Sequence, residues 1–240
     1  MKYKEIYIAE TDSTNRYLRE HPTADDVVVT TDYQTAGRGC GSNTWESERG
    51  QNLTFSVLIH PTGVEAARQF RLSMAISLAI VDALSCYVDE GLSIKWPNDI
   101  YWHDRKLCGI LIECTLSGQT IRDCIIGVGL NVNQQQFVSD APNPVSLRQI
   151  TGRELDREEV LQRVLGAFDP CGADAARYRS LLYRRVGFHA YCDAQGTFEA
   201  RLVTVEDDGH LVLEDRRGCR RRYAFKEVQF VLNHDSDLKK

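Results

Sequence analysis

The sequence lacks any long hydrophobic run. The longest uninterrupted apolar stretches among its 240 residues are only a few residues long, whereas a helix that crosses a bilayer needs roughly 20. The first ten residues, MKYKEIYIAE, also lack the apolar segment of a signal peptide. We therefore expect a cytoplasmic protein with no membrane association.

The spacings typical of metal sites and disulfide frameworks are missing as well. None of the eight cysteines forms a CxxC pair, and none of the six histidines forms an HxxxH pair. Cys108, Cys114 and Cys124 fall within apolar, strand-like stretches, where a free cysteine packs as a small hydrophobic residue. We interpret the cysteines as reduced structural thiols, with a redox or metal role as the alternative, and we assign no residue to a metal.

The chain has no excess of positive charge. Its 29 basic and 34 acidic residues give a net charge of −5, which disfavours a general nucleic-acid coat or a polybasic membrane binder. With 42% hydrophobic and 26% charged residues, the composition is that of an ordinary globular protein. A chain of this length can bury a core without disulfides.

Residues 1 to about 186 read as a mixture of helices and strands. Phe70, Met74, Leu78 and Val81 recur at spacings of three or four, which predicts a helix over 64–88. Further helices are expected after the capping residues at 11–15, over 156–168 and over 173–185. Strands are expected at about 27–31, 53–59, 92–96, 100–102, 107–115 and 120–128, the last four as an antiparallel meander.

From about residue 187 the chain reads only as short strands. Turn sequences at 207–209 and 216–218 separate short apolar runs. Their number and spacing fit a small β-barrel of SH3-like size. We therefore expect two domains, residues 1–186 and 187–240.

Three segments carry the residue types of a binding site. The first, 34–45 (QTAGRGCGSNTW), follows a strand and places three glycines around one arginine, so that backbone amides and a guanidinium could surround an anion. Trp45 could stack on a planar ring. A flexible surface loop is the alternative, since the segment matches neither a dinucleotide fingerprint nor a phosphate-binding P-loop.

The second segment spans 95–113. In its first part, KWPND, Pro97 has no backbone N–H to donate to a neighbouring strand, so that the chain must break or bend there. Asn98 and Asp99 would then be presented at a strand junction. Lys106 then precedes an apolar run at the mouth of a hairpin, where a solvated lysine is the alternative. The third segment, 127–133 (GVGLNVN), has small residues that let a ligand approach the sheet, or that mark a β-bulge without a ligand.

Together these motifs resemble those of the biotin protein ligases. Ser13–Thr14–Asn15, the loop 34–45, KWPND at 95–99, the run 106–113 (KLCGILIE) and 127–131 occur in the order expected of that family, together with a β-rich tail. The resemblance implies an α+β fold, with a mixed β-sheet flanked by helices as in class II aminoacyl-tRNA synthetases. It also implies the monofunctional type, without an N-terminal DNA-binding domain and without DNA binding.

The activity that the resemblance implies is an ATP-dependent ligation. Biotin and ATP, with Mg²⁺, form biotinyl-5′-adenylate and pyrophosphate, and biotin then passes to one lysine of a biotin carboxyl carrier domain. Lys106, Arg38 and Asp99 are the implied catalytic residues, with Asp99 orienting the incoming amine. A homodimer is a further expectation, because some relatives pair through sheet edges.

The resemblance also assigns the binding residues. Those for biotin are Ser13, Thr14, Asn15, Gln34, Gly37, Arg38, Gly39, Lys106, Gly109 and Gly127. Those for ATP and the adenylate are Arg38, Cys40, Trp45, Asn52, Lys95, Asn98, Lys106 and Asn131. The chain departs from the family at 40–42. Family members usually have arginine or glutamine, then any residue, then glycine after the position of Gly39, whereas this chain has Cys-Gly-Ser. A cysteine cannot form arginine's charge-assisted bonds, so that the adenylate could be held more loosely.

Other functions stay open on the sequence. A lipoate or octanoate ligase or transferase of the same superfamily is the nearest alternative, although KWPND argues against it. Cys40 acting as an acyl-carrying nucleophile is another. The non-enzymatic alternative is a nucleic-acid-binding module that uses the arginine-rich run 216–222, although the position of that run on a predicted hairpin favours a solvated tip or a docking surface for an acidic carrier domain.

Overall fold

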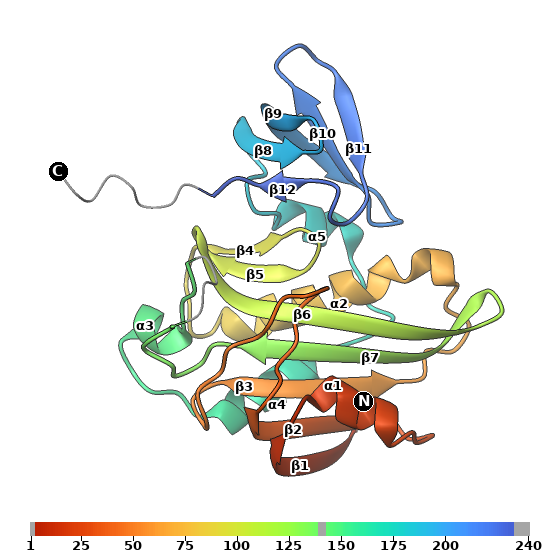
Figure 1. The fold of residues 1–240 in the computed structure, drawn as a ribbon, viewed down its shortest axis with the longest axis vertical. Helices are drawn as coiled ribbons and strands as arrows, with labels where there is room; N and C mark the ends of the chain where they lie inside the picture. Colours follow the sequence, from red (N-terminus) through yellow and green to blue (C-terminus); the bar gives the residue numbers. More distant parts are fainter. Residues whose placement is uncertain (1–2, 139–142, 233–240) are drawn as a thin grey trace.

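The computed structural model describes residues 3–138 and 143–232, which form two sheets and the helices packed on them (Figure 1). The larger sheet has seven strands in the order β1-β2-β3-β7-β6-β5-β4. Only β1 and β2 are parallel, and every other neighbouring pair is antiparallel. The strands are β1 (Lys4–Thr11), β2 (Val27–Gln34), β3 (Leu53–Ile59), β4 (Leu92–Lys95), β5 (Asp99–Trp102), β6 (Arg105–Ser117) and β7 (Thr120–Leu130).

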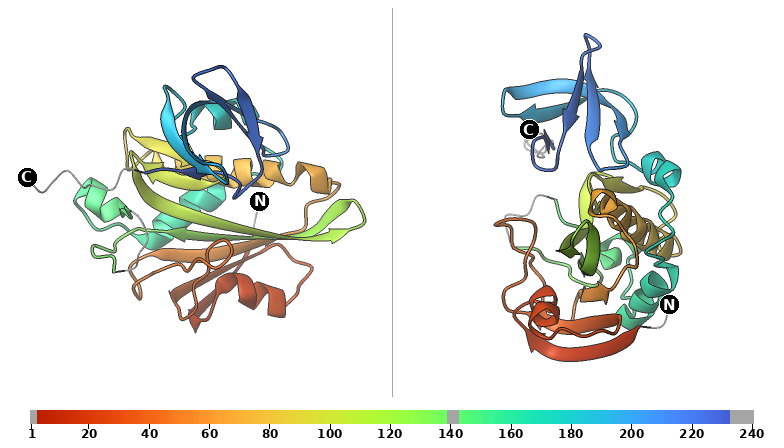
Figure 2. Two further views of the ribbon diagram at one scale, coloured as in Figure 1. Left: turned by 45° about the horizontal axis from the view of Figure 1, so that its top comes forward. Right: turned by 90° about the vertical axis from the view of Figure 1, so that its right-hand side faces the viewer.

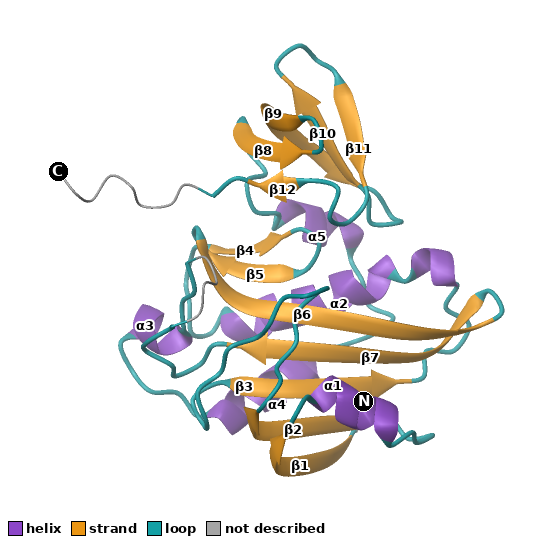
Figure 3. Cartoon of the chain, viewed as in Figure 1, coloured by secondary structure: helices purple, strands orange, loops and turns teal. Residues whose placement is uncertain are grey.

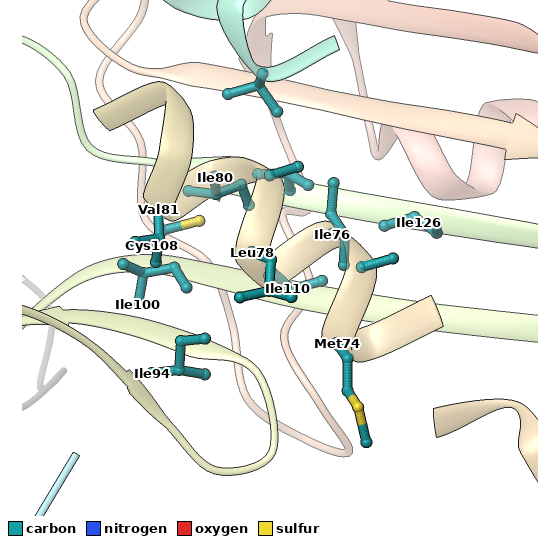
Figure 4. Close-up of a cluster of buried hydrophobic side chains, with 14 of the residues drawn as sticks. Met74, Ile76, Leu78, Ile80, Val81, Ile94, Ile100, Cys108, Ile110 and Ile126 are labelled. Carbon is teal, nitrogen blue, oxygen red and sulfur yellow. The ribbon is translucent and has the colours of Figure 1, made fainter. Parts of the chain in front are cut away.

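The two faces of this sheet are covered differently. Helix α2 (Phe70–Leu84) lies on one face, and all but two of its 15 residues are buried, as expected of a helix enclosed on all sides. Its outer side packs against α4 (Arg157–Ala167) and α5 (Ala175–Ser180). Figure 4 shows side chains of α2 beside Ile110 and Ile126 of the central strands. Helix α1 (Thr14–Glu20) packs over the other face, against β2, β3 and β7.

The helix expected over 64–88 is shorter in the structure. Gly63 has a φ of +71°, and Glu65 pairs with Thr120, so that the start of the predicted range is extended chain. A single 3-10 turn, Ala66–Arg68, precedes α2. Helix α5 also stops earlier than predicted, because Tyr183 donates its backbone N–H to Ile94 of β4 (2.9 Å). Strand β1 and helix α3 (Leu147–Thr151) were not predicted.

The C-terminal region forms the second sheet, which is antiparallel (Figure 3). Its strands, in the order β11-β10-β9-β8-β12, are β8 (His189–Asp193), β9 (Gly196–Val205), β10 (Leu211–Asp215), β11 (Arg220–Tyr223) and β12 (Gln229–Phe230). Among the described residues β11 and β12 do not pair, so that this sheet stays open rather than closing into a barrel. A mixed sheet flanked by helices, followed by a small β unit, confirms the predicted fold class.

The two sheets are joined by direct contacts, with the smaller sheet above the β4–β5 end of the larger one (Figure 2). Trp96 donates its indole N–H to the carbonyl of Gly209 (2.8 Å), and one hydrophobic cluster includes Ile94 of β4 together with Tyr191 and Leu213 of the second sheet. Within the described residues, none of the helices is both long enough and apolar enough to span a membrane.

Candidate functional site

The glycines in the middle of strands β6 and β7 all lie on one face of the sheet, opposite to the face that packs on α2. Because side chains alternate along a strand, Ile110 and Ile126 pack toward α2 while Gly109 and Gly127 face the opposite side. Gly109 is the register partner of Gly129, so that two glycines lie side by side in the middle of the sheet. This area, formed by Gly109, Gly127 and Gly129 and called the glycine floor below, lacks side chains of its own.

The segment 35–45 folds onto the glycine floor. Trp45 donates its backbone N–H to Gly37 (2.9 Å), and Gly39 donates to Asn43 (2.8 Å). A β-carbon at position 109 would lie 3.0 Å from Trp45 Cζ3, and one at position 129 would overlap the indole. The indole therefore rests directly on the floor. Its Nε1 is buried and has no hydrogen-bond partner within the described parts of the chain.

Lys106 and Asp99 form an ion pair beside this indole. Lys106 Nζ lies 2.7 Å from Asp99 Oδ2 and 6.0 Å from the Trp45 ring centroid. Both side chains keep about a quarter of their surface exposed (27% and 24%). Lys106 Nζ would also lie 3.3 Å from a β-carbon at position 109. The strand-to-strand hairpin of β5 and β6 thus places an ammonium and a carboxylate at the edge of the floor.

A buried polar cluster lies at the other end of the floor, where α1 begins. Thr14 donates its backbone N–H to Gln34 Oε1 (2.9 Å). Ser56 Oγ lies 2.6 Å from both Thr14 Oγ1 and Asn15 Oδ1, and Asn15 donates to Glu113 Oε2 (2.8 Å). A β-carbon at position 127 would overlap the Asn15 amide. Ser13, the N-cap of α1, is buried beside this cluster.

Two buried asparagines lie where the chain leaves β7. Asn52 has both ends of its amide engaged, since it donates to Gln134 Oε1 (2.6 Å) and accepts from the backbone N–H of Val132 (3.0 Å). Asn131 donates to the carbonyl of Val145 (3.0 Å). Its Oδ1 is buried and unpartnered in the part of the chain that the structure describes. A buried acceptor without a donor is costly, which makes this oxygen a candidate contact for a ligand donor.

Two more of the predicted residues belong to the KWPND segment that carries Asp99. Lys95 Nζ lies over the rings of Tyr101 and Phe230, at 5.3 and 5.2 Å, and burial lowers the pKa of its ammonium. Asn98 donates to Ser73 Oγ of α2 (3.4 Å). Lys95 is the register partner of Asp99, and the charges of Asp99 and Lys106 both act on its ammonium, so that it lies beside that ion pair. Asn98 precedes Asp99 in the chain and has no contact with Trp45 among the described interactions.

The loop residues Arg38 and Cys40 stay near the surface. The Arg38 side chain is exposed, and among the described residues it has no ion-pair or hydrogen-bond partner. Cys40 is partly exposed and free. The loop therefore offers one exposed cation without a partner among the described residues.

Sequence reasoning missed Ser56 and Glu113, which hold Thr14 and Asn15 in place. A partial signal for Ser56 was present in the sequence, because alternation places this polar residue on the strand face opposite to Phe55 and Val57. The structure shows that this second face is buried too, and that Ser56 is fully buried on it. A polar residue at a buried strand position needs a polar partner. For Glu113 no such signal exists, since its partner Asn15 lies 98 positions away.

The arginine-rich run 216–222 is largely neutralised by carboxylates of its own sheet. Arg216 pairs with Glu199 (2.7 Å), Arg220 with Glu214 (2.8 Å) and Arg222 with Glu206 (2.6 Å). This pairing argues against a nucleic-acid-binding patch. Within the described chain the one group with metal-ligand geometry is Glu206, Asp208 and His210, and Arg222 also pairs with two of these residues.

Comparison with protein families and curated proteins gives a consistent result. Residues 7–131 match the family described as "Biotin/lipoate A/B protein ligase family". The bifunctional ligase/repressor BirA of Bacillus spizizenii is 30% identical, over 92% of this chain and 71% of the relative. The biotin--[acetyl-CoA-carboxylase] ligase of Paracoccus denitrificans is 31% identical, over 88% of this chain and 94% of the relative.

Solved structures give the same answer for the fold. A biotin protein ligase from Aquifex aeolicus, determined in complex with biotin and ATP, superposes with a TM-score of 0.79 at 27% sequence identity. The match covers 96% of this chain and 99% of that one. The similarity therefore extends through both sheets.

Proposed function

Since the chain belongs to the biotin/lipoate protein ligase family, as one of its biotin protein ligases, we propose that it joins biotin to a carrier protein at the expense of ATP. In the first step a biotin carboxylate oxygen attacks the α-phosphate of ATP, and biotinyl-5′-adenylate and pyrophosphate form. In the second, the amine of a carrier lysine takes the biotinyl group and AMP leaves. The observation that carries this proposal is the Lys106–Asp99 pair beside Trp45 at the edge of the glycine floor.

Lys106 is the principal catalytic residue in this proposal. A carboxylate and a phosphate repel each other, and negative charge grows on the phosphate oxygens during attack, so that a fixed cation between them lowers the barrier most. The Lys106 ammonium lies at the glycine floor, 3.3 Å from the place of a β-carbon at position 109 and beside the indole that covers the floor. Arg38 adds a second cation from the loop above.

Biotin fits the end of the floor at α1. Its ureido ring is neutral and needs a few oriented hydrogen bonds on an otherwise apolar wall. Ser13, Thr14, Asn15 and Gln34 supply such groups in a buried cluster, and Ser56 fixes Thr14 and Asn15. Gly109 and Gly127 let the Trp45 indole and the Asn15 amide lie directly against the sheet, and Gly37 and Gly39 let the loop pack closely on itself; the biotin ring and its chain would bind among these four glycines, between the cluster and Lys106.

The adenylate fits the opposite end, beside Trp45 and Asn131. The unpartnered Oδ1 of Asn131 is an acceptor for the exocyclic amine of adenine, and the indole offers a stacking surface. Asn52 acts on this end through Val132, because its side-chain oxygen accepts a hydrogen bond from the Val132 backbone N–H. Cys40 is part of the loop 35–45. Direct contacts of Lys95 and Asn98 with the adenylate stay a prediction. Magnesium would arrive on the ATP phosphates, where it neutralises charge, and we assign it no protein ligand.

Asp99 has two roles in the proposed sequence of steps. It holds the Lys106 ammonium at 2.7 Å before substrates bind. Once that ammonium turns to the anions, the carboxylate can accept a hydrogen bond from the incoming carrier amine and orient it toward the adenylate. The loop 35–45 would cover the mixed anhydride meanwhile and exclude water.

Several finer expectations stay predictions. The acceptor is expected to be a biotin carboxyl carrier domain. The domain boundary between residues 186 and 187 and the homodimer are likewise untested, and β1, an outer strand of the larger sheet, offers the edge at which two copies could pair.

The test is a product assay. The protein is incubated with ATP, magnesium and biotin, and mass spectrometry should then detect biotinyl-5′-adenylate; biotin-dependent exchange of pyrophosphate into ATP should appear in parallel. The same assay with lipoate and with octanoate is the matched control. Exchange that depends on lipoate and not on biotin would assign the chain to the other branch of its family.

A further inference from the structure

Lys226 of the smaller sheet reaches the tip of the glycine-rich loop of the larger one. It lies in the turn between β11 and β12, and a β-carbon at Gly41 would overlap its ammonium. Gly41 itself has a φ of +71°, at the outermost turn of the loop. The right-hand view of Figure 2 shows the segment between β2 and β3 rising toward the C-terminal strands. Residues 185 positions apart in the sequence thus meet above the glycine floor.

The position of Lys226 is fixed by its neighbours. Phe225 packs edge-on against Trp96, with ring centroids 6.0 Å apart, and Ala224 donates its backbone N–H to Glu227 Oε2 (2.7 Å). Lys226 has a φ of +73°, a conformation that a lysine adopts only when its surroundings impose it. The turn is therefore anchored to the KWPND segment on one side and lies against the loop on the other.

Lys226 is also an uncompensated charge. Within the described residues it has no ion-pair or hydrogen-bond partner, and the same holds for the Arg38 side chain. By contrast Arg220, Arg221 and Arg222 of the adjoining β11 each pair with a carboxylate. An exposed lysine held in a strained turn, beside a loop with a single charged residue, is placed to meet an anion from solution.

We propose that Lys226 binds the β- and γ-phosphates of ATP and stabilises the departing pyrophosphate. This rests on the ligase activity proposed above. When the biotin carboxylate oxygen bonds to the α-phosphorus, the bond from that phosphorus to the bridging oxygen breaks and its electron pair leaves with pyrophosphate. Lys106 lies at the floor, Arg38 belongs to the loop, and Lys226 lies at the loop tip. We expect these three cations, from three segments, to contact the triphosphate.

The experiment separates the two half-reactions. Lys226→Met keeps the length of the side chain and removes its charge, and Lys226→Arg keeps the charge. Biotin-dependent pyrophosphate exchange measures KM for ATP in the first half-reaction. The rate of transfer from preformed biotinyl-5′-adenylate to the carrier measures the second half-reaction, in which pyrophosphate takes no part. We expect Lys226→Met to raise KM for ATP and to lower the exchange rate, so that kcat/KM for ATP falls about tenfold. The rate of transfer to the carrier should stay within about twofold of wild type. Lys226→Arg should restore exchange.

A second variant covers the case of misfolding. Lys226→Gly removes the charge and relieves the left-handed backbone, so that it should fold at least as well and show the same defect as Lys226→Met. Adding a cation to the loop, as Cys40→Arg in the Lys226→Met protein, should recover part of the exchange.

Two results would overturn the proposal in different ways. Equal KM for ATP in wild type and both neutral variants would remove Lys226 from the phosphate site. Equal losses in exchange and in transfer would assign it to holding the loop. Absence of biotin-dependent exchange in the wild-type protein would instead remove the ligase function itself.

Discussion

The two faces of the seven-stranded sheet come from alternate residues of the same strands, and they differ in what they bury. Toward α2 the strands present Ile110, Ile126 and Val128, which fill the space beneath the helix. Toward the loop they present Gly109, Gly127 and Gly129, and the space above them is filled by Trp45 and by the amide of Asn15. An apolar interior and a glycine-lined surface covered by a tryptophan and an amide thus lie back to back, one residue apart.

This difference separates the residues that stabilise the fold from those that bind. On the α2 face, buried apolar area supplies stability in proportion to its amount. On the loop face, hydrogen bonds of the polar cluster and the Lys106–Asp99 ion pair lie on either side of the Trp45 indole. A substitution on one face should therefore change stability, and a substitution on the other should change activity.

The largest expected effect is that of Lys106→Ala. Losing the cation between the two substrate anions should lower the rate of adenylate formation by about 100-fold or more, roughly 3 kcal/mol of transition-state stabilisation. Single-turnover kinetics with biotin and ATP measure it. Lys4→Ala is the matched control, because Lys4 is exposed and 4.0 Å from Asp25 at the far edge of the sheet. Near-normal adenylate formation by Lys106→Ala would remove Lys106 from the catalytic role.

An intermediate effect is expected of Gly127→Ala. The new β-carbon would overlap the Asn15 amide, which Ser56 and Glu113 hold in place, so that KM for biotin should rise about tenfold. Steady-state kinetics at saturating ATP give this value.

Gly166→Ala is the control for this substitution. Gly166 lies in α4 with nothing within 4 Å of a β-carbon, so that alanine should leave KM unchanged and raise stability by about 0.5–1 kcal/mol. An unchanged KM in Gly127→Ala would show that the polar cluster is not the biotin end of the floor.

The smallest effect on activity is expected on the α2 face. Ile126→Val removes one buried methylene next to Gly127 in the chain, and should cost about 0.5–1.5 kcal/mol of unfolding free energy. Urea denaturation measures that cost, and KM for biotin should stay within about twofold of wild type. A changed KM together with unchanged stability would contradict the separation of the two faces.

Local patterns in the sequence predicted much of the fold. The spacing of Phe70, Met74 and Leu78 located α2, and alternation located β3, because each depends on neighbours within one element. The ends of α2 and α5 were wrong, since they are set by pairing with Thr120 and with β4. The open second sheet was equally beyond reach, because closure depends on whether its two outermost strands meet.

The candidate site was predicted as a set of motifs but not as a geometry. The glycines, Lys106 and Trp45 could be identified from the sequence, whereas the Lys106–Asp99 ion pair and the polar cluster could not. Asp99 and Lys106 are seven positions apart and meet across a bulged hairpin, and Ser56 meets Asn15 across 41 positions. The contact of Lys226 with Gly41 is farther still, and no local pattern encodes it.

The Lys106–Asp99 ion pair has a consequence for substrate choice. An ammonium that already has an internal carboxylate gains little from exchanging it for a lone acetate or inorganic phosphate from the cell. When a substrate carboxylate and a nucleotide phosphate bind together, two negative groups compete with the single Asp99 carboxylate for the Lys106 ammonium. We expect only that combination to displace Asp99. We therefore expect the resting ion pair to resist common metabolite anions.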